Sequence, residues 1–212
     1  MNDAKTNPWL KIPAEDYEGH MSFKNVGQLQ ALNGIFNDIF REYTPASLCV
    51  LGCTTGNGFE YINRNITKKI TCIDINKDYL KILEERYGQK LAGLELLCGD
   101  LKEIDLPAES FDLIYGALIF EYIDVNSVLK NVSQWLKRGG TLAVVLQIKS
   151  ENLNAVSETP FHSLKYLNGL FNYVEPENFE KVAYELGLIK KKSYMYDLNS
   201  GKKFYIGHFR KK

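Results

Sequence analysis

A glycine-rich segment at residues 52–58, with the sequence GCTTGNG, is the part of the chain whose spacing most directly suggests chemistry. Glycine allows a sharp backbone turn and lets a ligand approach closer than any Cβ would permit. Residues 59–62 (FEYI) then have the pattern of a helix start, and backbone N–H groups beside a helix N-terminus can bind a polar or anionic group. The segment therefore predicts a binding turn, with a plain turn as the alternative for the glycines alone.

Two carboxylates stand at equivalent points further along the chain. Asp74 ends a second apolar run, and Asp100 follows a third. In doubly wound sheets, a carboxylate after the second strand accepts hydrogen bonds from ribose hydroxyls, and one after the third can accept from an adenine amine. Each alone could equally be a loop charge or a helix cap. Because the carboxyl ends of these strands meet at one crevice, the three features together predict a nucleoside-containing ligand.

The elements that must position these residues follow an alternating pattern. Amphipathic segments at residues 77–87 and 125–136 predict helices, the first with Asn76 as N-cap and the second ended by Gly139 and Gly140. Between such segments lie near-continuous apolar runs, typical of strands that are buried on both faces. This alternation predicts an α/β doubly wound sheet. The five runs occupy residues 47–51, 70–75, 94–98, 112–115 and 141–148.

The two ends of the chain depart from this alternation. An aromatic-rich arm at residues 9–23 precedes an amphipathic helix at residues 29–40, and residues 150–172 form a polar and aromatic stretch without a clear period. We expect the arm and this stretch to close over the site as a lid, with a brace packed outside the helices as the alternative. The last part of the chain predicts a helix and then a β-hairpin, at residues 176–187, 189–196 and 203–209.

Composition limits the kind of protein. The 212 residues carry 26 Lys and Arg against 26 Asp and Glu, and this zero net charge argues against a dedicated nucleic-acid binder. No apolar run is long enough for a membrane span and the first residues lack a signal-peptide pattern, so we expect a cytoplasmic protein. The four cysteines lack C-x-x-C spacing and only three histidines accompany them, which predicts buried thiols and no metal site.

These motifs, in this order, resemble those of the class I S-adenosylmethionine-dependent methyltransferases, and the resemblance runs from about Ser47 to Phe209. The first motif of that family is an acidic residue, one further residue and then G-x-G-x-G. Here Val50 takes the acidic position and Thr54 replaces the middle glycine. The later motifs, and the glycine turn before the fifth strand, match at residues 73–75, 99–100, 110–119 and 136–144.

The resemblance implies a doubly wound, mostly parallel seven-stranded Rossmann-like sheet with an antiparallel C-terminal hairpin and an N-terminal helical cap. Residues 1–45 would form the cap or lid and residues 46–212 the core, with residues 150–175 as a substrate-covering insertion. The implied cofactor is S-adenosyl-L-methionine, and the implied reaction is in-line transfer of its methyl group to a small-molecule acceptor. Paired prolines and a Pro-Cys pair, typical of DNA methylases, are absent.

The resemblance also assigns cofactor contacts to single residues. Asp74 would hold the ribose, Ile75 and Leu101 would sandwich the adenine, and Asp100 would accept a hydrogen bond from its amine. The remaining contacts, to the methionine end and the sulfonium, would come from Tyr17, Gly52, Cys53, Thr54, Thr55, Gly56, Asn57, Gly58, Gly116 and Ala117.

Two residues are candidates for a catalytic base. They are His20 in the arm and Glu121 after the fourth strand, and a cap of the following helix is the alternative for Glu121. A cofactor-binding but non-catalytic regulatory protein of the same fold is an alternative function. A nicotinamide-dependent reductase is less favoured, because its G-x-G-x-x-G fingerprint is replaced here by G-x-x-x-G-x-G.

Overall fold

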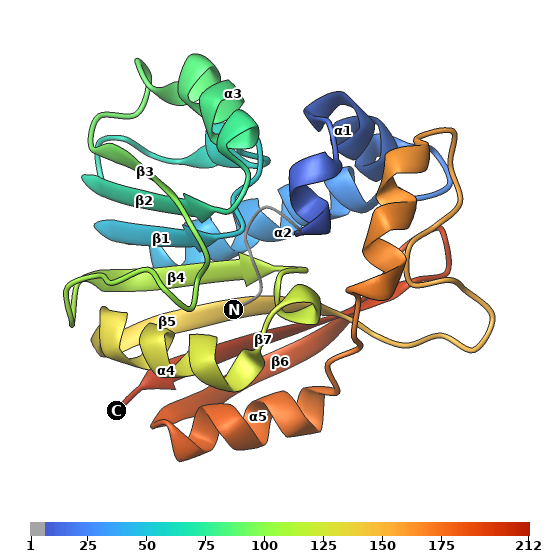
Figure 1. Ribbon diagram of the computed structural model, residues 1–212. Coiled ribbons are helices and arrows are strands. Elements are labelled where there is room, and N and C mark those ends of the chain that lie inside the picture. The colour runs from blue at the N-terminus through green and yellow to red at the C-terminus, as the bar shows by residue number, and fades with distance from the viewer. Residues whose placement is uncertain (1–6) are drawn as a thin grey trace.

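The computed structural model describes residues 7–212, which form a seven-stranded sheet with the order β3-β2-β1-β4-β5-β7-β6 (Figure 1). Strands β1 to β5 pair in parallel, whereas β7 pairs antiparallel with both β5 and β6. The predicted mostly parallel sheet with an antiparallel C-terminal hairpin is confirmed. The strands are β1 (Ser47–Leu51), β2 (Lys69–Asp74), β3 (Leu94–Cys98), β4 (Phe111–Ala117), β5 (Leu136–Gln147), β6 (Leu188–Asp197) and β7 (Lys203–Lys211).

Helices cover both faces of this sheet, with α2 behind it and α4 and α5 in front in Figure 1. Successive strand residues point to opposite faces, so Leu48 and Val50 join the apolar cluster of α2 and α3, while Cys49 and Leu51 join that of α4 and α5. Burial on both faces explains the near-continuous apolar runs. The helices are α1 (Ala14–Ser22), α2 (Gln28–Tyr43), α3 (Lys77–Tyr87), α4 (Val125–Trp135) and α5 (Pro176–Glu185).

The connection from β1 to β2 departs from the expected helix start. Only a 3₁₀ turn, η3 (Phe59–Tyr61), forms before the chain turns again. In that second turn the N–H groups of Ile66 and Thr67 both donate to the Asn63 carbonyl. The Asn63 side chain also accepts from the backbone N–H of Asn65 (3.0 Å), a local bond that competes with helical hydrogen bonding. The helix therefore stops after one turn.

The boundary between α4 and β5 also differs from the expectation. The helix ends at Trp135 and the strand begins at Leu136, so the glycine pair lies inside the strand and does not end the helix. Gly139 has a positive φ of 76° where the register between β4 and β5 shifts. The glycines thus form a bulge that realigns β5. The N-cap assigned to Asn76 is confirmed, since its side chain accepts from the N–H groups of α3.

Burial of the cysteines is confirmed for Cys49, Cys53 and Cys72 and is wrong for Cys98. Cys98 is exposed because it lies on β3, the strand at one edge of the sheet. Within residues 7–212, no helix combines the length and the apolar character that crossing a bilayer requires.

The arm and the stretch after β5 lie next to each other at the carboxyl ends of the parallel strands (Figure 1). Two hydrogen bonds join them: one lies between His20 Nδ1 and Thr159 Oγ (2.9 Å), and in the other Ser163 Oγ donates to Asp16 Oδ2 (2.5 Å). We call residues 8–22 and 150–172 the cover segments. Besides α1 they contain two 3₁₀ helices, η2 (Pro8–Lys11) and η5 (His162–Gly169).

Candidate functional site

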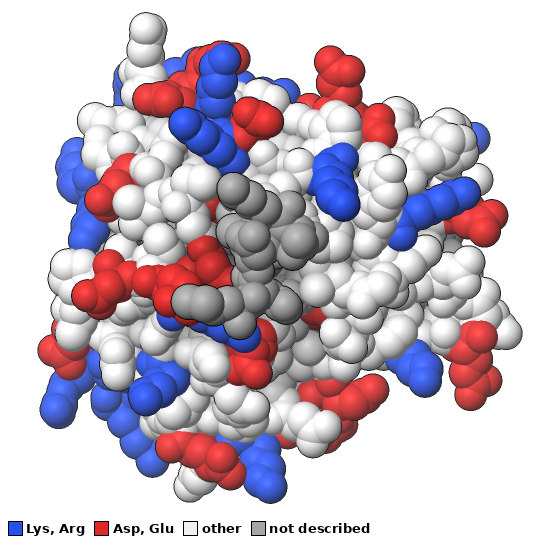
Figure 2. Space-filling model, viewed as in Figure 1, with Lys and Arg blue, Asp and Glu red and all other residues white. Residues whose placement is uncertain are grey.

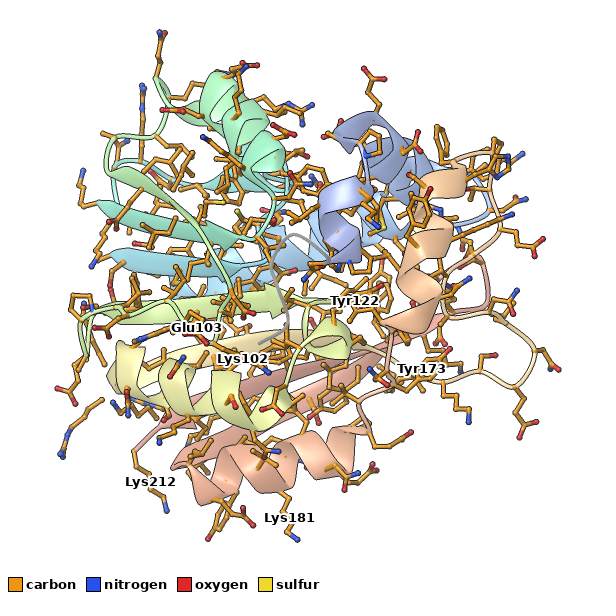
Figure 3. All side chains as sticks on the ribbon, in the orientation of Figure 1. Lys102, Glu103, Tyr122, Tyr173, Lys181 and Lys212 are labelled. Atoms are coloured by element: carbon orange, nitrogen blue, oxygen red, sulfur yellow. The ribbon has the colours of Figure 1, made fainter. Side chains whose placement is uncertain are left out.

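A cavity of about 950 Å³ lies between the strand ends and the cover segments. Lys102 and Glu103, which follow β3, and Tyr122, in the 3₁₀ turn η4 (Phe120–Tyr122) after β4, belong to its lining and are labelled in Figure 3. Of the predicted site residues, the structure brings nine together on its wall. They are Tyr17, His20, Gly52, Thr54, Asp74, Ile75, Asp100, Leu101 and Ala117.

Asp74, the last residue of β2, is the most firmly held carboxylate in this lining. Its Oδ2 accepts from the backbone N–H of Thr54 (2.8 Å) and its Oδ1 from that of Asn76 (2.8 Å). Burial raises the pKa of Asp74 to about 6, although these backbone hydrogen bonds act to lower it. The group is therefore mostly ionised at pH 7, and it is fixed against the glycine-rich segment.

Only part of the glycine-rich segment faces the cavity. Gly52 and Thr54 belong to the lining, and Gly52 has a φ of 63°, where a Cβ would come 2.9 Å from the Ile119 side chain. The other predicted members point elsewhere. A Cβ on Gly58 would meet Phe36 of α2, and the Asn57 side chain donates to a carbonyl of α2.

The five segment residues that do not line the cavity are Cys53, Thr55, Gly56, Asn57 and Gly58. Cys53 is buried in the core, where burial raises the pKa of its thiol well above the ordinary value. Thr55 donates to Glu18 of α1. These residues hold the segment to its neighbours, so their placement does not support direct side-chain contact with a ligand.

Of the residues expected around an adenine and a sulfonium, all but one line the cavity. Ile75, Asp100 and Leu101 all line the cavity. Asp100 Oδ1 accepts from the backbone N–H of Lys102 (2.9 Å). Ala117 lines the cavity but Gly116 does not, because Gly116 packs against Phe120, where a Cβ would come within 2.9 Å of the ring.

Two residues of α1 reach the cavity from the cover side. Burial raises the pKa of Tyr17 to about 12, and a hydrogen bond with Thr54 opposes this rise. Burial and the charge of Lys202 lower the pKa of His20 to about 4, so its imidazole is neutral at pH 7. Both groups can therefore donate or accept hydrogen bonds there without carrying charge.

Glu121 does not belong to the lining. It is 1% exposed, and its Oε1 accepts from the backbone N–H of Gln147 (2.6 Å), while its Oε2 has no partner among residues 7–212. Burial raises its pKa to about 7. The cap alternative is wrong, because Asp124 caps α4 by accepting from the Ser127 N–H (2.7 Å).

Some residues that shape the site were not identified from the sequence. Glu18 of α1 binds Arg86 of α3 (2.5 Å) and accepts from Thr55, which fastens α1 beside the glycine-rich segment. No spacing in the sequence signals this contact. Gln28 and Gln147 also line the cavity. Gln147 could have been identified as a polar residue at the end of the fifth strand, by the argument used for Asp74.

Comparisons with known proteins agree with this architecture. Residues 49–144 match the family model described as a methyltransferase domain. Over 86% of this chain and 86% of the other, the fold matches a putative sarcosine dimethylglycine methyltransferase from Galdieria sulphuraria (TM-score 0.66, 17% identity). It also matches the N-methyltransferase NodS from Bradyrhizobium japonicum WM9 (TM-score 0.64, 15% identity, 86% and 95% covered).

The same fold also occurs in the cyclase SpnF (TM-score 0.68, 15% identity, 86% and 81% covered), so the fold alone does not define the reaction. No curated protein sequence matches this chain. Residues 49–144 thus match a methyltransferase domain, and the strand order and the solved structures that share it show that the chain has the fold of the class I S-adenosylmethionine-dependent methyltransferases.

Proposed function

We propose that the protein binds S-adenosylmethionine in this cavity and transfers its methyl group to a small-molecule acceptor. The observation that carries the proposal is the cavity itself, whose lining includes Asp74 and Gln147 at strand ends and His20 in the cover segments. Its volume of about 950 Å³ is at the upper end of ordinary ligand pockets, as expected for two ligands side by side.

The residues present fit such a cofactor in two respects. A carboxylate offers about four acceptor positions, and the N–H groups of Thr54 and Asn76 use two of those of Asp74, which leaves positions for ribose hydroxyls. Trp9 also lines the cavity, and its indole N–H is buried without a partner among residues 7–212. An acceptor atom on a bound ligand would satisfy that donor.

In this arrangement Asp74 binds the ribose, Ile75 and Leu101 hold the adenine, and Asp100 accepts from its amine. Gly52 and Thr54 support the methionine end, and Ala117 lies beside the sulfonium. S-Adenosylmethionine, when bound, supplies an already activated methyl group. The chain therefore contributes alignment of the acceptor and exclusion of water, which are sufficient for an in-line displacement.

Proton removal would have a small part in this mechanism. Tyr17 and His20 are the titratable residues of α1 in the lining; the raised pKa of Tyr17 keeps its proton, and the lowered pKa of His20 makes it a weak base. Both then serve as hydrogen-bonding groups that orient the acceptor. Glu121 lies behind the wall and acts as a positioning residue through its bond to Gln147.

The cover segments are proposed to exclude water from this step. Their side chains supply part of the apolar wall, including Leu164, Leu167, Leu170 and Phe171, and hydrogen bonds tie the two segments to each other. The exposed surface supports a small acceptor over nucleic acid, because Lys and Arg share the face in Figure 2 with Asp and Glu.

Transfer with a labelled methyl group tests the proposal. The protein is incubated with methyl-deuterated S-adenosylmethionine and acceptor libraries, and S-adenosylhomocysteine and labelled products are measured by mass spectrometry. We expect labelled product from at least one acceptor class, and less of it with an Asp74→Ala control at a cofactor concentration that does not saturate the variant. Binding of the cofactor without transfer across a broad panel would favour the non-catalytic alternative.

A further inference from the structure

Lys202 is a lysine in the turn between β6 and β7, yet it is only 3% exposed. Its ammonium donates to the carbonyl of Ala155 (2.7 Å) and to Oε1 of Gln147 (3.4 Å). Both partners are neutral, and Lys202 forms no ion pair with any residue between 7 and 212. A buried charge without a counter-charge costs free energy, so this arrangement favours an anion nearby.

The two partners of Lys202 belong to the cavity wall. Gln147 and Ala155 both line the cavity, as does Gln28, whose Nε2 donates to the same Gln147 Oε1 (3.1 Å). The Gln147 Nε2 donates in turn to the Ala155 carbonyl (3.0 Å). Lys202 therefore lies directly behind a wall of amide groups. The Gln147 Oε1 accepts from Lys202 Nζ and from Gln28 Nε2, and the second N–H of the Gln28 amide remains free to donate to a ligand.

His20 adds a second donor at this end. The N–H of Phe161 donates to Thr159 Oγ (3.3 Å), and the Thr159 hydroxyl contacts His20 Nδ1 (2.9 Å). This network favours donation from the hydroxyl to Nδ1, which leaves the imidazole proton on Nε2. The charge of Lys202 reaches this ring, where it helps to lower the pKa of His20. The wall thus carries N–H donors backed by a positive charge.

The carboxylates of the lining lie at or just after the ends of three strands. They are Asp74, the last residue of β2, Asp100 and Glu103 after β3, and Asp124 after β4, and none of them forms an ion pair with Lys202. Glu121 is a buried carboxyl that contacts the same glutamine as Lys202 does. It accepts from the main-chain N–H of Gln147 and does not bind Lys202. Burial raises its pKa to about 7, so it is only partly ionised at neutral pH, and it forms no ion pair with Lys202. Among residues 7–212, Lys202 therefore has no carboxylate within ion-pair distance.

We propose that the acceptor is a carboxylic acid whose carboxylate binds at the Gln28 and His20 end of the cavity, with Lys202 as the positioning residue behind Gln147. This inference rests on the proposed function, since it names the acceptor class of the same site. The body of the acid would lie against Met21, Leu32, Leu164 and Leu167, which makes it an acid with an apolar chain or ring.

The experiment compares acids with their own amides, which have the same shape without the charge. A panel of such pairs, including 3-phenylpropanoate and 3-phenylpropanamide, is titrated calorimetrically at pH 7 with and without S-adenosylhomocysteine. We expect acids to bind about 10- to 150-fold more tightly than their amides, as for a hydrogen-bonded charge. A panel in which no acid binds more tightly than its amide overturns the proposal.

Two lysine variants locate the source of that preference. Lys202→Met removes the buried charge and should reduce the acid preference to about threefold or less, with cofactor affinity unchanged. Lys203→Met, on the same hairpin but exposed and paired with Asp197 (3.0 Å), should retain the full preference. An acid preference that survives in Lys202→Met contradicts the assignment.

Two further measurements distinguish a misfolded variant, a failure of the acid-site proposal and a failure of the proposed function. If Lys202→Met melts at a much lower temperature, Gln28→Met tests the same wall without touching the lysine, and the same loss of preference is expected. Titration of S-adenosylhomocysteine alone reports on the proposed function. Acid preference without cofactor binding would refute that function and retain the anion site, whereas cofactor binding without acid preference would do the reverse.

Discussion

Residues at the strand ends and residues of the cover segments enclose one cavity but differ in charge and in how they are held. The strand ends present Asp74 and Asp100, and parallel pairing of β1, β2 and β3 fixes their backbone positions. The cover segments present neutral groups such as His20 and apolar side chains. They are held by side-chain hydrogen bonds, such as that between Ser163 and Asp16, and by apolar residues such as Leu164 that join the core.

This difference suggests a division of roles. A position fixed by sheet register cannot move without disturbing the core, so it suits a cofactor site that stays constant. A surface held by a few side-chain contacts can change with little cost to the core, so it suits the acceptor. We expect substitutions in the two regions to affect cofactor affinity and acceptor choice separately.

The largest expected effect concerns Glu121, which lies behind the wall between the two regions. Burial raises its pKa from 4.5 to about 7, so the folded state holds this proton more tightly than the unfolded state. Stability from the protonated form is present at acidic pH and is lost as pH rises from 4.5 through 7. That difference corresponds to about 3 kcal/mol.

The Glu121→Gln variant tests this pH dependence, because glutamine does not titrate. The free energy of unfolding, measured by urea denaturation between pH 5 and pH 8, should fall by about 2 to 3 kcal/mol more in the wild type than in the variant. Parallel curves for the two proteins would show that the carboxyl is not the source of the loss.

Asp74→Ala should have the next largest effect, and it acts on the cofactor side. Removing a carboxylate that binds ligand hydroxyls typically costs about 1.5–3 kcal/mol, or about 10- to 150-fold in affinity for S-adenosylmethionine. Part of the loss would come from the loop, since Asp74 also accepts from the N–H groups of Thr54 and Asn76.

Isothermal calorimetry measures this change, with Asp78→Ala as the control. Asp78 is an exposed acid in the first turn of α3, close to Asp74 in sequence but outside the lining. The control should bind cofactor as the wild type does. Unchanged affinity in Asp74→Ala would remove the ribose assignment.

The smallest effect is expected for Glu18→Gln, which loosens the attachment of α1 to the strand-end region. Its partner Arg86 is partly exposed, so the ion pair is worth about 1 kcal/mol or less. Cofactor affinity should fall by about fivefold or less, because α1 still contacts Thr55. Glu15→Gln, an exposed acid on the same helix, should bind normally, and an equal loss in both variants would point to net charge rather than this contact.

The sequence predicts one of these regions better than the other. Strand ends can be located because apolar runs locate the strands, and parallel pairing then brings Asp74 and Asp100 to one edge. The cover segments have no hydrophobic period, and their contacts join residues far apart in the chain, such as His20 and Thr159. Nothing in the local pattern predicts such a pair.

Differences between the expected and observed placement of residues in the strand-end region have a similar cause. Cys53 and Gly56 belong to the glycine-rich segment, but the direction of each depends on backbone angles that motif spacing does not specify. Glu121 follows β4 closely in sequence, yet the turn after the strand directs it behind the wall. The sequence locates a turn more reliably than it orients each residue of that turn.

A crystal structure of the complex with S-adenosylhomocysteine tests the central claim, that this cavity is the cofactor site, most directly. We expect density for the ligand with both ribose hydroxyls in hydrogen-bonding range of Asp74. The adenine should lie between Ile75 and Leu101, and the sulfur should face Ala117 and the open space toward Gln147. Density for the ligand anywhere else, or an empty cavity at saturating ligand, would contradict it.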